Sequence, residues 1–292
     1  MKPAPFAYHS PSSVAEANAL LMQYAGDVSV LAGGQSLIPL LNMRLARPAV
    51  IVDLGRIKAL DYVEEGDGYL AIGAMTRQRT VHESDVVARA CPLLTEALGH
   101  VGHVPIRSRG TIGGSIAHAD PAAELPTVIT ALNGSVKCIG PDGERIVAAT
   151  DFFVGFLTTA LEPGEIVAEL RFPVLGETAG TCFLEVARRH GDFALTGVAV
   201  AVTLDDRRCM AAHVALNGVG LTPAKPATVE ASLVGTTLSD GVIDKAGADV
   251  GASVDPSSDL HADGEFRVHL ATVLTRRALR IARGRASGES YE

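Results

Sequence analysis

Two glycine-rich segments contain the residue types that bind phosphate through the backbone. The first, Ala32-Gly33-Gly34-Gln35-Ser36, follows the apolar run 28–31, and the second is Thr111-Ile112-Gly113-Gly114-Ser115. Glycine lets a backbone N–H group come close to a phosphate oxygen, and Gln, Ser and Thr add hydrogen-bond donors. A dinucleotide has a diphosphate at its centre, so the pair of segments predicts a dinucleotide site. Either segment alone would more often be an ordinary turn.

A nicotinamide site of the Rossmann type is the first alternative. Asp53 lies about twenty residues after the first glycine pair, where an acidic ribose ligand is found in that fold. The fingerprint G-x-G-x-x-G is missing, however, because no glycine occurs between Gly34 and Gly55. We therefore disfavour this fold.

The composition indicates a folded chain without a nucleic-acid site or a transmembrane segment. The 292 residues are 47% hydrophobic and 20% charged, and the net charge is -8 with scattered Lys and Arg. Phosphate must then be bound by local N–H groups and not by a general positive field. The most apolar run, 195–204, is too short to span a bilayer. The four cysteines lie far apart, so we expect no metal site, reduced thiols and a cytoplasmic location.

Hydrophobic periodicity predicts two α/β units followed by three long strands, the last two joined as a hairpin by residues 205–207. Strands are expected at 28–31, 49–54, 68–74, 135–140, 144–147, 165–172, 181–188, 197–204 and 210–218. Helices are expected after the capping box of Ser13 and Glu16, at 37–41, at 92–98, from Asp120 to Leu132, and at 269–283. Residues 103–118 fit neither pattern. The polar break at 176–180 predicts a domain boundary.

The same segments resemble motifs of a known family. Residues 30–45 (VLAGGQSLIPLLNMRL), followed by 51–54 (IVDL), are similar to the first flavin loop of the FAD-binding medium subunits of molybdenum hydroxylases. This family includes the carbon monoxide dehydrogenase and xanthine dehydrogenase type enzymes. Residues 106–126 (IRSRGTIGGSIAHADPAAELP) resemble its second flavin loop, and 189–194 (RHGDFA) resemble its C-terminal domain. The resemblance runs from about residue 1 to 285.

This resemblance implies an α+β fold in which the FAD-binding domain is of the PCMH, or vanillyl-alcohol-oxidase, type. That domain would cover residues 1–176 as two α/β subdomains, at about 1–57 and 58–176. Residues 177–292 would form a C-terminal domain with a three-stranded antiparallel sheet and helices.

The resemblance also implies one bound FAD, with its diphosphate and ribityl chain against the two glycine-rich segments. Glu124 would hydrogen-bond near the ribose, Val167 would pack on the flavin ring, and Asp192 and Phe193 would lie beside the isoalloxazine. Some relatives carry Tyr in place of Phe193. The expected cofactor-binding residues are Ala32, Gly33, Gly34, Gln35, Ser36, Leu37, Thr111, Ile112, Gly113, Gly114, Ser115, Glu124, Val167, Asp192 and Phe193.

Several of these polar residues have a structural alternative. Glu124 falls one turn into a predicted helix, where the helix dipole favours a carboxylate without any ligand. Arg107 and Arg109 either contact phosphate or hold the loop through carbonyl groups. His118 and Asp120 fit a proton relay, but Asp120 is equally explained as a helix cap.

The implied function is that of an oxidoreductase subunit. No activated nucleophile, acid–base carboxylate pair or metal cluster stands out, so we expect no catalytic residue and no metal ligand here. The chain would be the FAD-carrying electron-transfer subunit in a dimer of heterotrimers. A small subunit would hold [2Fe–2S] clusters, a large subunit would hold the molybdenum cofactor, and electrons would leave to an external acceptor. The substrate cannot be read from this chain.

Three other functions stay open at this point. They are a self-contained FAD-dependent oxidoreductase with its own substrate pocket, a nicotinamide-dependent dehydrogenase, and a non-catalytic flavin- or nucleotide-binding module.

Overall fold

A computed structural model describes residues 2–289, and its first unit is a small parallel sheet. The strands have the order β1-β3-β2. The elements of this unit are β1 (Ala7–His9), α1 (Val14–Gln23), β2 (Val28–Leu31), α2 (Leu37–Asn42), β3 (Val50–Asp53), and the 3-10 turns η1 (Leu54–Arg56) and η2 (Lys58–Leu60). Because β2 and β3 are parallel, their carboxyl ends meet at one edge, which places the first glycine-rich segment beside Asp53.

The second unit is built on a five-stranded antiparallel sheet with the order β4-β5-β10-β6-β7. Its strands are β4 (Val63–Glu65), β5 (Tyr69–Gly73), β6 (Ser135–Gly140), β7 (Gly143–Ala148) and β10 (Ile166–Pro173), with a hairpin of β8 (Phe153–Gly155) and β9 (Thr158–Thr159). Its helices are α3 (Gln78–His82), α4 (Asp85–Ala90), α5 (Pro92–His100), α6 (Val104–Arg109), α7 (Ile112–His118), α8 (Glu124–Ala131) and α9 (Ala149–Phe152). Apolar side chains of the sheet and of α5, α7 and α8 form the largest core.

The third unit is a three-stranded antiparallel sheet with helices. Its elements are β11 (Ala179–Ala187), β12 (Ala194–Asp205), β13 (Arg208–Asn217), α10 (Ala227–Leu233), α11 (Asp240–Ser253) and α12 (Gly264–Ala286). Val198, Val200 and Val202 of β12 pack beneath α11 and α12. Ala199 and Ala201, on the other face of the strand, join the core of the second unit. Both faces are covered, so the sequence of β12 is a continuous apolar run.

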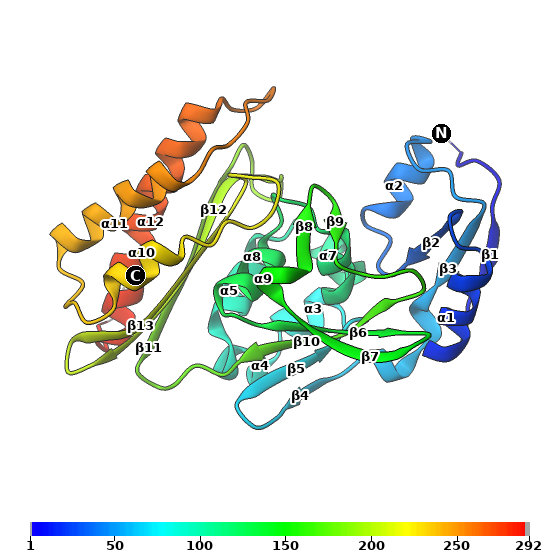
Figure 1. Ribbon diagram of the computed structural model, residues 1–292, viewed down its shortest axis with the longest axis horizontal. Helices are drawn as coiled ribbons and strands as arrows, with labels where there is room; N and C mark the ends of the chain where they lie inside the picture. Colours follow the sequence, from blue (N-terminus) through cyan, green and yellow to red (C-terminus); the bar gives the residue numbers. More distant parts are fainter. Residues whose placement is uncertain (1, 290–292) are drawn as a thin grey trace.

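The three units lie in a row, with the second between the other two (Figure 1). Glu96 of α5 connects the second and third units. Its carboxylate accepts hydrogen bonds from the hydroxyl of Thr181 at 2.8 Å and the N–H group of Phe183 at 3.1 Å. It also pairs with the guanidinium of Arg285 at 2.9 Å. The third unit is therefore held to α5 by polar contacts as well as by the shared core.

The structure confirms the expected α+β fold and corrects some element boundaries. Residues 103–118, which fit no pattern, form the short helices α6 and α7. Helix α8 begins at Glu124 and not after Asp120, whose carboxylate instead accepts the N–H group of Ala122 in a turn at 2.9 Å. Helix α12 begins before the expected residue 269, because Asp263 accepts the N–H group of Phe266 and caps it. Across residues 2–289, no helix combines the length and the apolar character that crossing a membrane requires.

Candidate cofactor site

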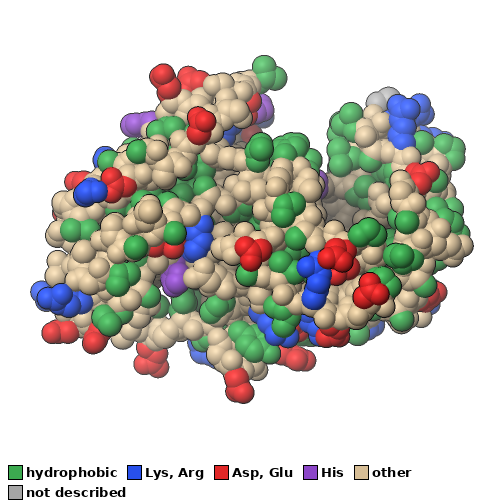
Figure 2. All heavy atoms as spheres, viewed as in Figure 1, with side chains coloured by type: hydrophobic (Ala, Val, Ile, Leu, Met, Phe, Trp, Pro, Cys, Tyr) green, Lys and Arg blue, Asp and Glu red, His purple; other side chains and the backbone are tan. Residues whose placement is uncertain are grey.

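A cavity of about 610 Å³ lies between the first and second units and reaches a loop of the third. Figure 2 shows the surface hollowed between the N-terminal unit and the middle of the molecule. All of the expected cofactor-binding residues line the cavity except Ile112. The Ile112 side chain is fully buried, and its N–H group donates to the carbonyl of Thr76 at 3.0 Å. The volume falls within the range of small-molecule and cofactor sites.

The first glycine-rich segment presents backbone donors that the described chain does not use. The N–H groups of residues 33–36 have no hydrogen-bond acceptor within residues 2–289. The amide of Gln35 donates to the carbonyl of Gly33 at 3.1 Å, which folds the side chain back onto the loop. Gly34 has a φ of 74°, a conformation that favours glycine. Consecutive N–H groups beside a cavity fit the negatively charged diphosphate of a dinucleotide.

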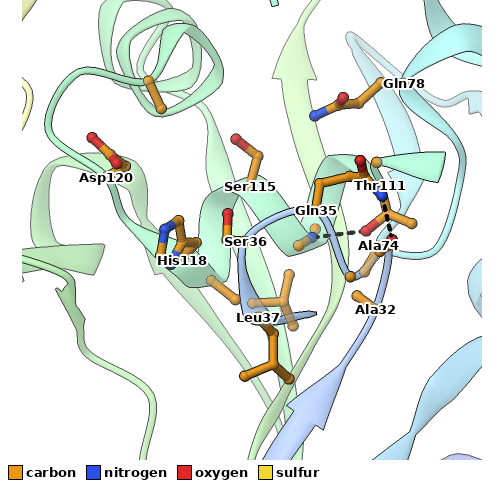
Figure 3. Close-up of a pocket in the computed structure, with 18 of the residues that line it drawn as sticks. Ala32, Gln35, Ser36, Leu37, Ala74, Gln78, Thr111, Ser115, His118 and Asp120 are labelled. Atoms are coloured by element: carbon orange, nitrogen blue, oxygen red, sulfur yellow. Dashed lines mark hydrogen bonds between the residues drawn. The ribbon is translucent and has the colours of Figure 1, made fainter. Parts of the chain in front are cut away.

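The second segment differs from the expectation that it repeats this chemistry. Residues 111–115 form the first turn of α7, and the Thr111 hydroxyl accepts the N–H group of Gly114 at 3.1 Å. The N–H group of Gly113 donates to the carbonyl of Ala74 at 2.9 Å, and that of Ser115 donates to the carbonyl of Thr111. The backbone donors of residues 112–115 are thus already paired within the chain. This segment offers side chains to the cavity instead (Figure 3).

The glycines also allow the two segments to touch. A Cβ atom on Gly33 would lie 2.5 Å from the carbonyl oxygen of Arg109 and 2.8 Å from the Cα atom of Gly110. A Cβ atom on Gly114 would lie 2.7 Å from the hydroxyl of Thr111 and 3.3 Å from the Cβ atom of Ala32. Glycine is therefore required here by packing between segments, in addition to any ligand.

The titratable side chains that line the cavity are acidic apart from one histidine. Within the described residues they are His118, Asp120, Glu124, Glu165 and Asp192, with no lysine or arginine. A ligand phosphate would therefore rely on backbone N–H groups, as the net charge of the sequence predicts.

The pKa values of two of these carboxyl groups are shifted in opposite directions. Burial, with a further contribution from the negative charges of Glu185 and Asp120, raises the pKa of Glu124 to about 8. The hydrogen bonds from Arg145 lower the pKa of Glu165, with both guanidinium contacts at 2.7 Å. At neutral pH, Glu124 is a hydrogen-bond donor at the cavity wall and Glu165 is an acceptor.

The third unit contributes the loop between β11 and β12. Asp192 and Phe193 of this loop line the cavity, and the Phe193 side chain is 70% exposed. Gly191 packs against the imidazole of His103. Val167, on β10 of the second unit, lies on the cavity wall and is buried. The structure thus brings motifs separated by more than 150 residues to one site.

The structure answers some of the alternatives left open by the sequence. Arg107 donates to the carbonyl groups of Val101 and Gly102 and does not line the cavity, so it holds the loop. Arg109 borders a separate depression of about 480 Å³ beyond the first glycine-rich segment. Asp120 faces the cavity and also closes the turn before α8. No group of three or more metal-binding side chains occurs within residues 2–289.

Sequence reasoning missed the contribution of the segment after β5. Ala74, Met75 and Gln78 line the cavity, and the Oε1 atom of Gln78 is buried without a hydrogen-bond partner in the described chain. Glu165, fixed by Arg145 of strand β7, was also missed. These positions arise from the pairing of distant strands, and no local motif marks them.

Comparison with known proteins identifies the family. Residues 4–175 match the model of the FAD binding domain in molybdopterin dehydrogenase. Residues 181–282 match the model of the CO dehydrogenase flavoprotein C-terminal domain. The chain belongs to the FAD-binding medium subunits of molybdenum hydroxylases, and its cofactor is FAD.

Individual relatives match over nearly the whole length. The chain is 39% identical to the caffeine dehydrogenase subunit beta of Pseudomonas sp. (strain CBB1), covering 98% of this chain and 97% of the relative. It is 38% identical to the carbon monoxide dehydrogenase medium chain of Afipia carboxidovorans, covering 98% and 99%. The structure of reconstituted CO dehydrogenase from Oligotropha carboxidovorans superimposes with a TM-score of 0.96 at 38% identity, covering 98% of this chain and 100% of that chain. Quinoline 2-oxidoreductase from Pseudomonas putida 86 gives a TM-score of 0.93 at 35% identity, covering 100% of both chains.

Proposed function

We propose that this chain is the electron-transfer subunit of a molybdenum-containing dehydrogenase. It receives electrons from [2Fe–2S] clusters of a small partner subunit and passes them to an external acceptor. The observation that carries the proposal is the cavity in which motifs of all three units meet, lined by the free backbone donors of residues 33–36 within the described chain. Such a site supplies position and electrostatics to a cofactor that performs the chemistry.

The residues of the cavity divide the binding of FAD between them in this proposal. The N–H groups of residues 33–36 bind the diphosphate, and Thr111 and Ser115 contact the adjoining ribityl chain. Glu124 donates a hydrogen bond near the ribose, because its raised pKa keeps it protonated at neutral pH. Val167 packs on the flavin ring, with Asp192 and Phe193 at the open side. FAD supplies the capacity to hold one or two electrons, which links single-electron clusters to a two-electron acceptor.

The proposed assembly is a dimer of heterotrimers in the cytoplasm. A large subunit carries the molybdenum cofactor, a small subunit carries the [2Fe–2S] clusters, and this chain is the medium subunit. In this proposal the chain is divided into FAD-binding subdomains at about 1–57 and 58–176 and a C-terminal domain at 177–292. The role of medium subunit is supported by the relatives, several of which are named as medium chains or as subunits.

The relatives also indicate where substrate choice is made. Proteins 39% and 38% identical to this chain are named for caffeine and carbon monoxide, and a closely superimposable structure is named for quinoline. These molecules share no size or charge that one cavity would select. We therefore assign substrate recognition to the large subunit, with this chain serving a step common to all of them.

Purification from the native source tests the proposal. We expect an iron–sulfur chain and a large molybdenum chain to co-purify with this one, and acid release to yield FAD. Within that complex, a substrate of the large subunit should bleach the flavin absorbance before the external acceptor is added. A lone chain that oxidises a substrate at a full rate would contradict the proposal and support a self-contained oxidoreductase.

A further inference from the structure

Helix α2 carries an exposed apolar surface that has no role in the proposed binding of FAD. It consists of Ile38 on the helix and of residues 43–47, which follow the helix, and we refer to it as the α2 surface. Leu45 is 73% exposed and Met43 is 50% exposed. A single exposed apolar residue is ordinary, but several that lie together indicate an interaction site.

The fold holds the segment after α2 in a fixed conformation. The N–H groups of Leu45 and Ala46 both donate to the carbonyl of Leu40, at 2.9 and 3.3 Å. Arg44 has a φ of 59°, in the left-handed region that residues other than glycine seldom adopt. Its Nε atom donates to the carbonyl of Lys2 at 3.2 Å. Strained backbone that the surrounding structure fixes in this way is found mainly at functional sites.

The α2 surface is basic, although the chain as a whole is acidic. Between Asp27 and Asp53 the only charged residues are Arg44 and Arg47, whereas the whole chain has a net charge of -8. Lys2, which Arg44 contacts, adds a third positive charge. Figure 2 shows Lys and Arg side chains beside hydrophobic ones at the end of the N-terminal unit where α2 lies. A surface of this kind is complementary to a partner whose facing surface is acidic.

Helix α2 also forms part of the wall of the FAD cavity. Leu37 and Leu40 line the cavity, and their three-residue spacing puts them on one side of the helix. Ile38 lies on another side and is exposed. An α-helix with its side chains is about 10–12 Å across. A partner on the α2 surface is therefore separated from the cavity by little more than this helix.

We propose that the α2 surface binds the iron–sulfur subunit through an acidic face of that subunit. The inference rests on the proposed electron-transfer function, which requires the electron donor to lie close to FAD. A [2Fe–2S] cluster held by cysteine thiolates has a net negative charge, which suits a basic docking surface. Met43 and Leu45 are buried at the centre of the contact, and Arg44 and Arg47 face carboxylates of the partner.

A second copy of this chain is a less suitable occupant of the α2 surface. Most homodimers have two-fold symmetry, so that a surface on the axis meets its own copy. Arg44 and Arg47 would then face the same two arginines of the other copy, and like charges repel. Charge therefore favours the iron–sulfur subunit.

A change of polarity and charge on the α2 surface tests the proposal in the three-subunit complex. The double variant Leu45→Glu, Arg47→Glu is co-expressed with the partner subunits, and an affinity tag is placed on this chain. The ratio of iron–sulfur subunit to FAD, followed over a dilution series, gives the dissociation constant. We expect it to rise roughly 10²-fold, because an apolar anchor is lost and a charge is reversed.

The matched control makes the same substitutions on the third unit. Leu260 is 98% exposed and Arg207 is also exposed, so Leu260→Glu, Arg207→Glu adds the same charges elsewhere. This control should keep the wild-type dissociation constant. FAD content and Tm should match the wild type in both double variants, which shows that the chain is folded.

The subunit that is lost decides the outcome. Loss of the iron–sulfur subunit with FAD retained supports the proposal, and a wild-type dissociation constant in Leu45→Glu, Arg47→Glu overturns it. Loss of the large subunit alone, or separation of the dimer into intact heterotrimers, also overturns it, because the surface then binds another chain. If no iron–sulfur subunit co-purifies with the wild type, the proposed function itself fails. The wild-type sample therefore distinguishes the two failures.

Oxidation of Met43 provides a second test that requires no substitution. Peroxide converts an accessible methionine to its sulfoxide. The full FAD-loaded chain is treated with peroxide, alone and with the iron–sulfur subunit, and sulfoxide is measured in peptides by mass spectrometry. We expect oxidation of Met43 to slow roughly tenfold in the presence of the partner. Met210 on β13 is 56% exposed and should oxidise at the same rate in both samples. Equal rates for Met43 in the two samples would also overturn the proposal.

Discussion

The two glycine-rich segments have similar sequences but use their backbone N–H groups differently. In the first, residues 33–36 have no acceptor within residues 2–289, whereas in the second, residues 112–115 donate to acceptors in the chain. The cause is local structure, because the second segment is a helical turn capped by Thr111 while Ser36 makes no side-chain cap. A Gly-Gly pair in the sequence therefore indicates that another group packs closely against the backbone, but it does not indicate whether that group is a ligand or another part of the chain. The first segment packs against a neighbouring loop and also has N–H groups free for a ligand, whereas the second packs mainly against other residues of the chain.

The largest effect is expected where the two segments meet. In the double variant Gly33→Val, Gly114→Val, the new side chains would collide with Arg109, Gly110 and Thr111. The Gly33 collision lies between the first segment and the loop that leads into the second, and the Gly114 side chain would also press on Ala32. The two collisions therefore separate the segments and disrupt both halves of the site. We expect complete loss of FAD, measured as the flavin-to-protein ratio after purification.

Gly176→Val is the matched control for this variant. A Cβ atom on Gly176 would meet nothing within 4 Å, so the same substitution adds bulk without a collision. Full flavin retention in the double variant would show that the segments do not form the site.

A substitution in the second segment alone should act on stability first. A Cβ atom on Gly113 would lie 2.3 Å from the Cβ atom of Ala74 and 2.8 Å from its carbonyl oxygen. Overpacking of this kind costs about 1–3 kcal/mol. We expect Gly113→Ala to lower the free energy of unfolding of the FAD-free chain by that amount, measured by denaturant titration. An unchanged midpoint would mean that this segment is not fixed to the end of β5.

The pH dependence of stability tests the side chains that follow the second segment. The pKa of Glu124 is about 8 in the folded chain, above its ordinary value, so the folded chain keeps a proton that the unfolded chain loses. The stability gained from this proton is fully present below the unfolded pKa and is lost as the pH rises toward 8. We expect the Tm of the FAD-free wild type to fall from about pH 5 to about pH 8 more steeply than that of Glu124→Gln. Parallel curves would place Glu124 in a solvated environment.

The smallest effects distinguish the two segments most directly. Thr111→Val removes the cap that accepts the Gly114 N–H group and should cost about 1 kcal/mol of unfolding free energy. Ser36→Ala removes a hydroxyl with no cap bond and should change stability by less than about 0.5 kcal/mol. FAD titration of the apo-protein should show weaker binding in Ser36→Ala. Equal losses of stability in the two variants would contradict the proposed difference in capping between the two segments.

Much of this fold could be predicted from the sequence, and the reasons for the exceptions are physical. Most of the longer sheet strands were located because alternation and continuous apolar runs reflect burial, as in β12, which is covered on both faces. The three-residue strands β1 and β4 were missed, because they are too short to show a pattern. Helices α6 and α7 were missed because each is one or two turns long and contains Pro or Gly. Helix α8 was expected to start at Asp120, but that carboxylate closes a turn instead.

The site was predictable where a motif carries it and not where tertiary pairing creates it. Residues 32–37 and 111–115 were identified because their composition itself has chemical meaning. Glu165 and Gln78 carry no such pattern. They come together only through strand pairing and helix packing, which a single sequence does not encode locally.

The cavity lies between the hydrophobic cores of the first and second units, which share few residues. Residues of the first unit form a small cluster with few members from its neighbour, and the second unit has the largest core. A ligand seated between them contributes to folding by mass action, at about 4 kcal/mol when its free concentration is a thousand times Kd. We therefore expect bound FAD to hold the first and second units together, so that amide hydrogen exchange in residues 2–57 slows on binding. Cofactor supply would then govern how much of the newly made chain reaches its assembled form.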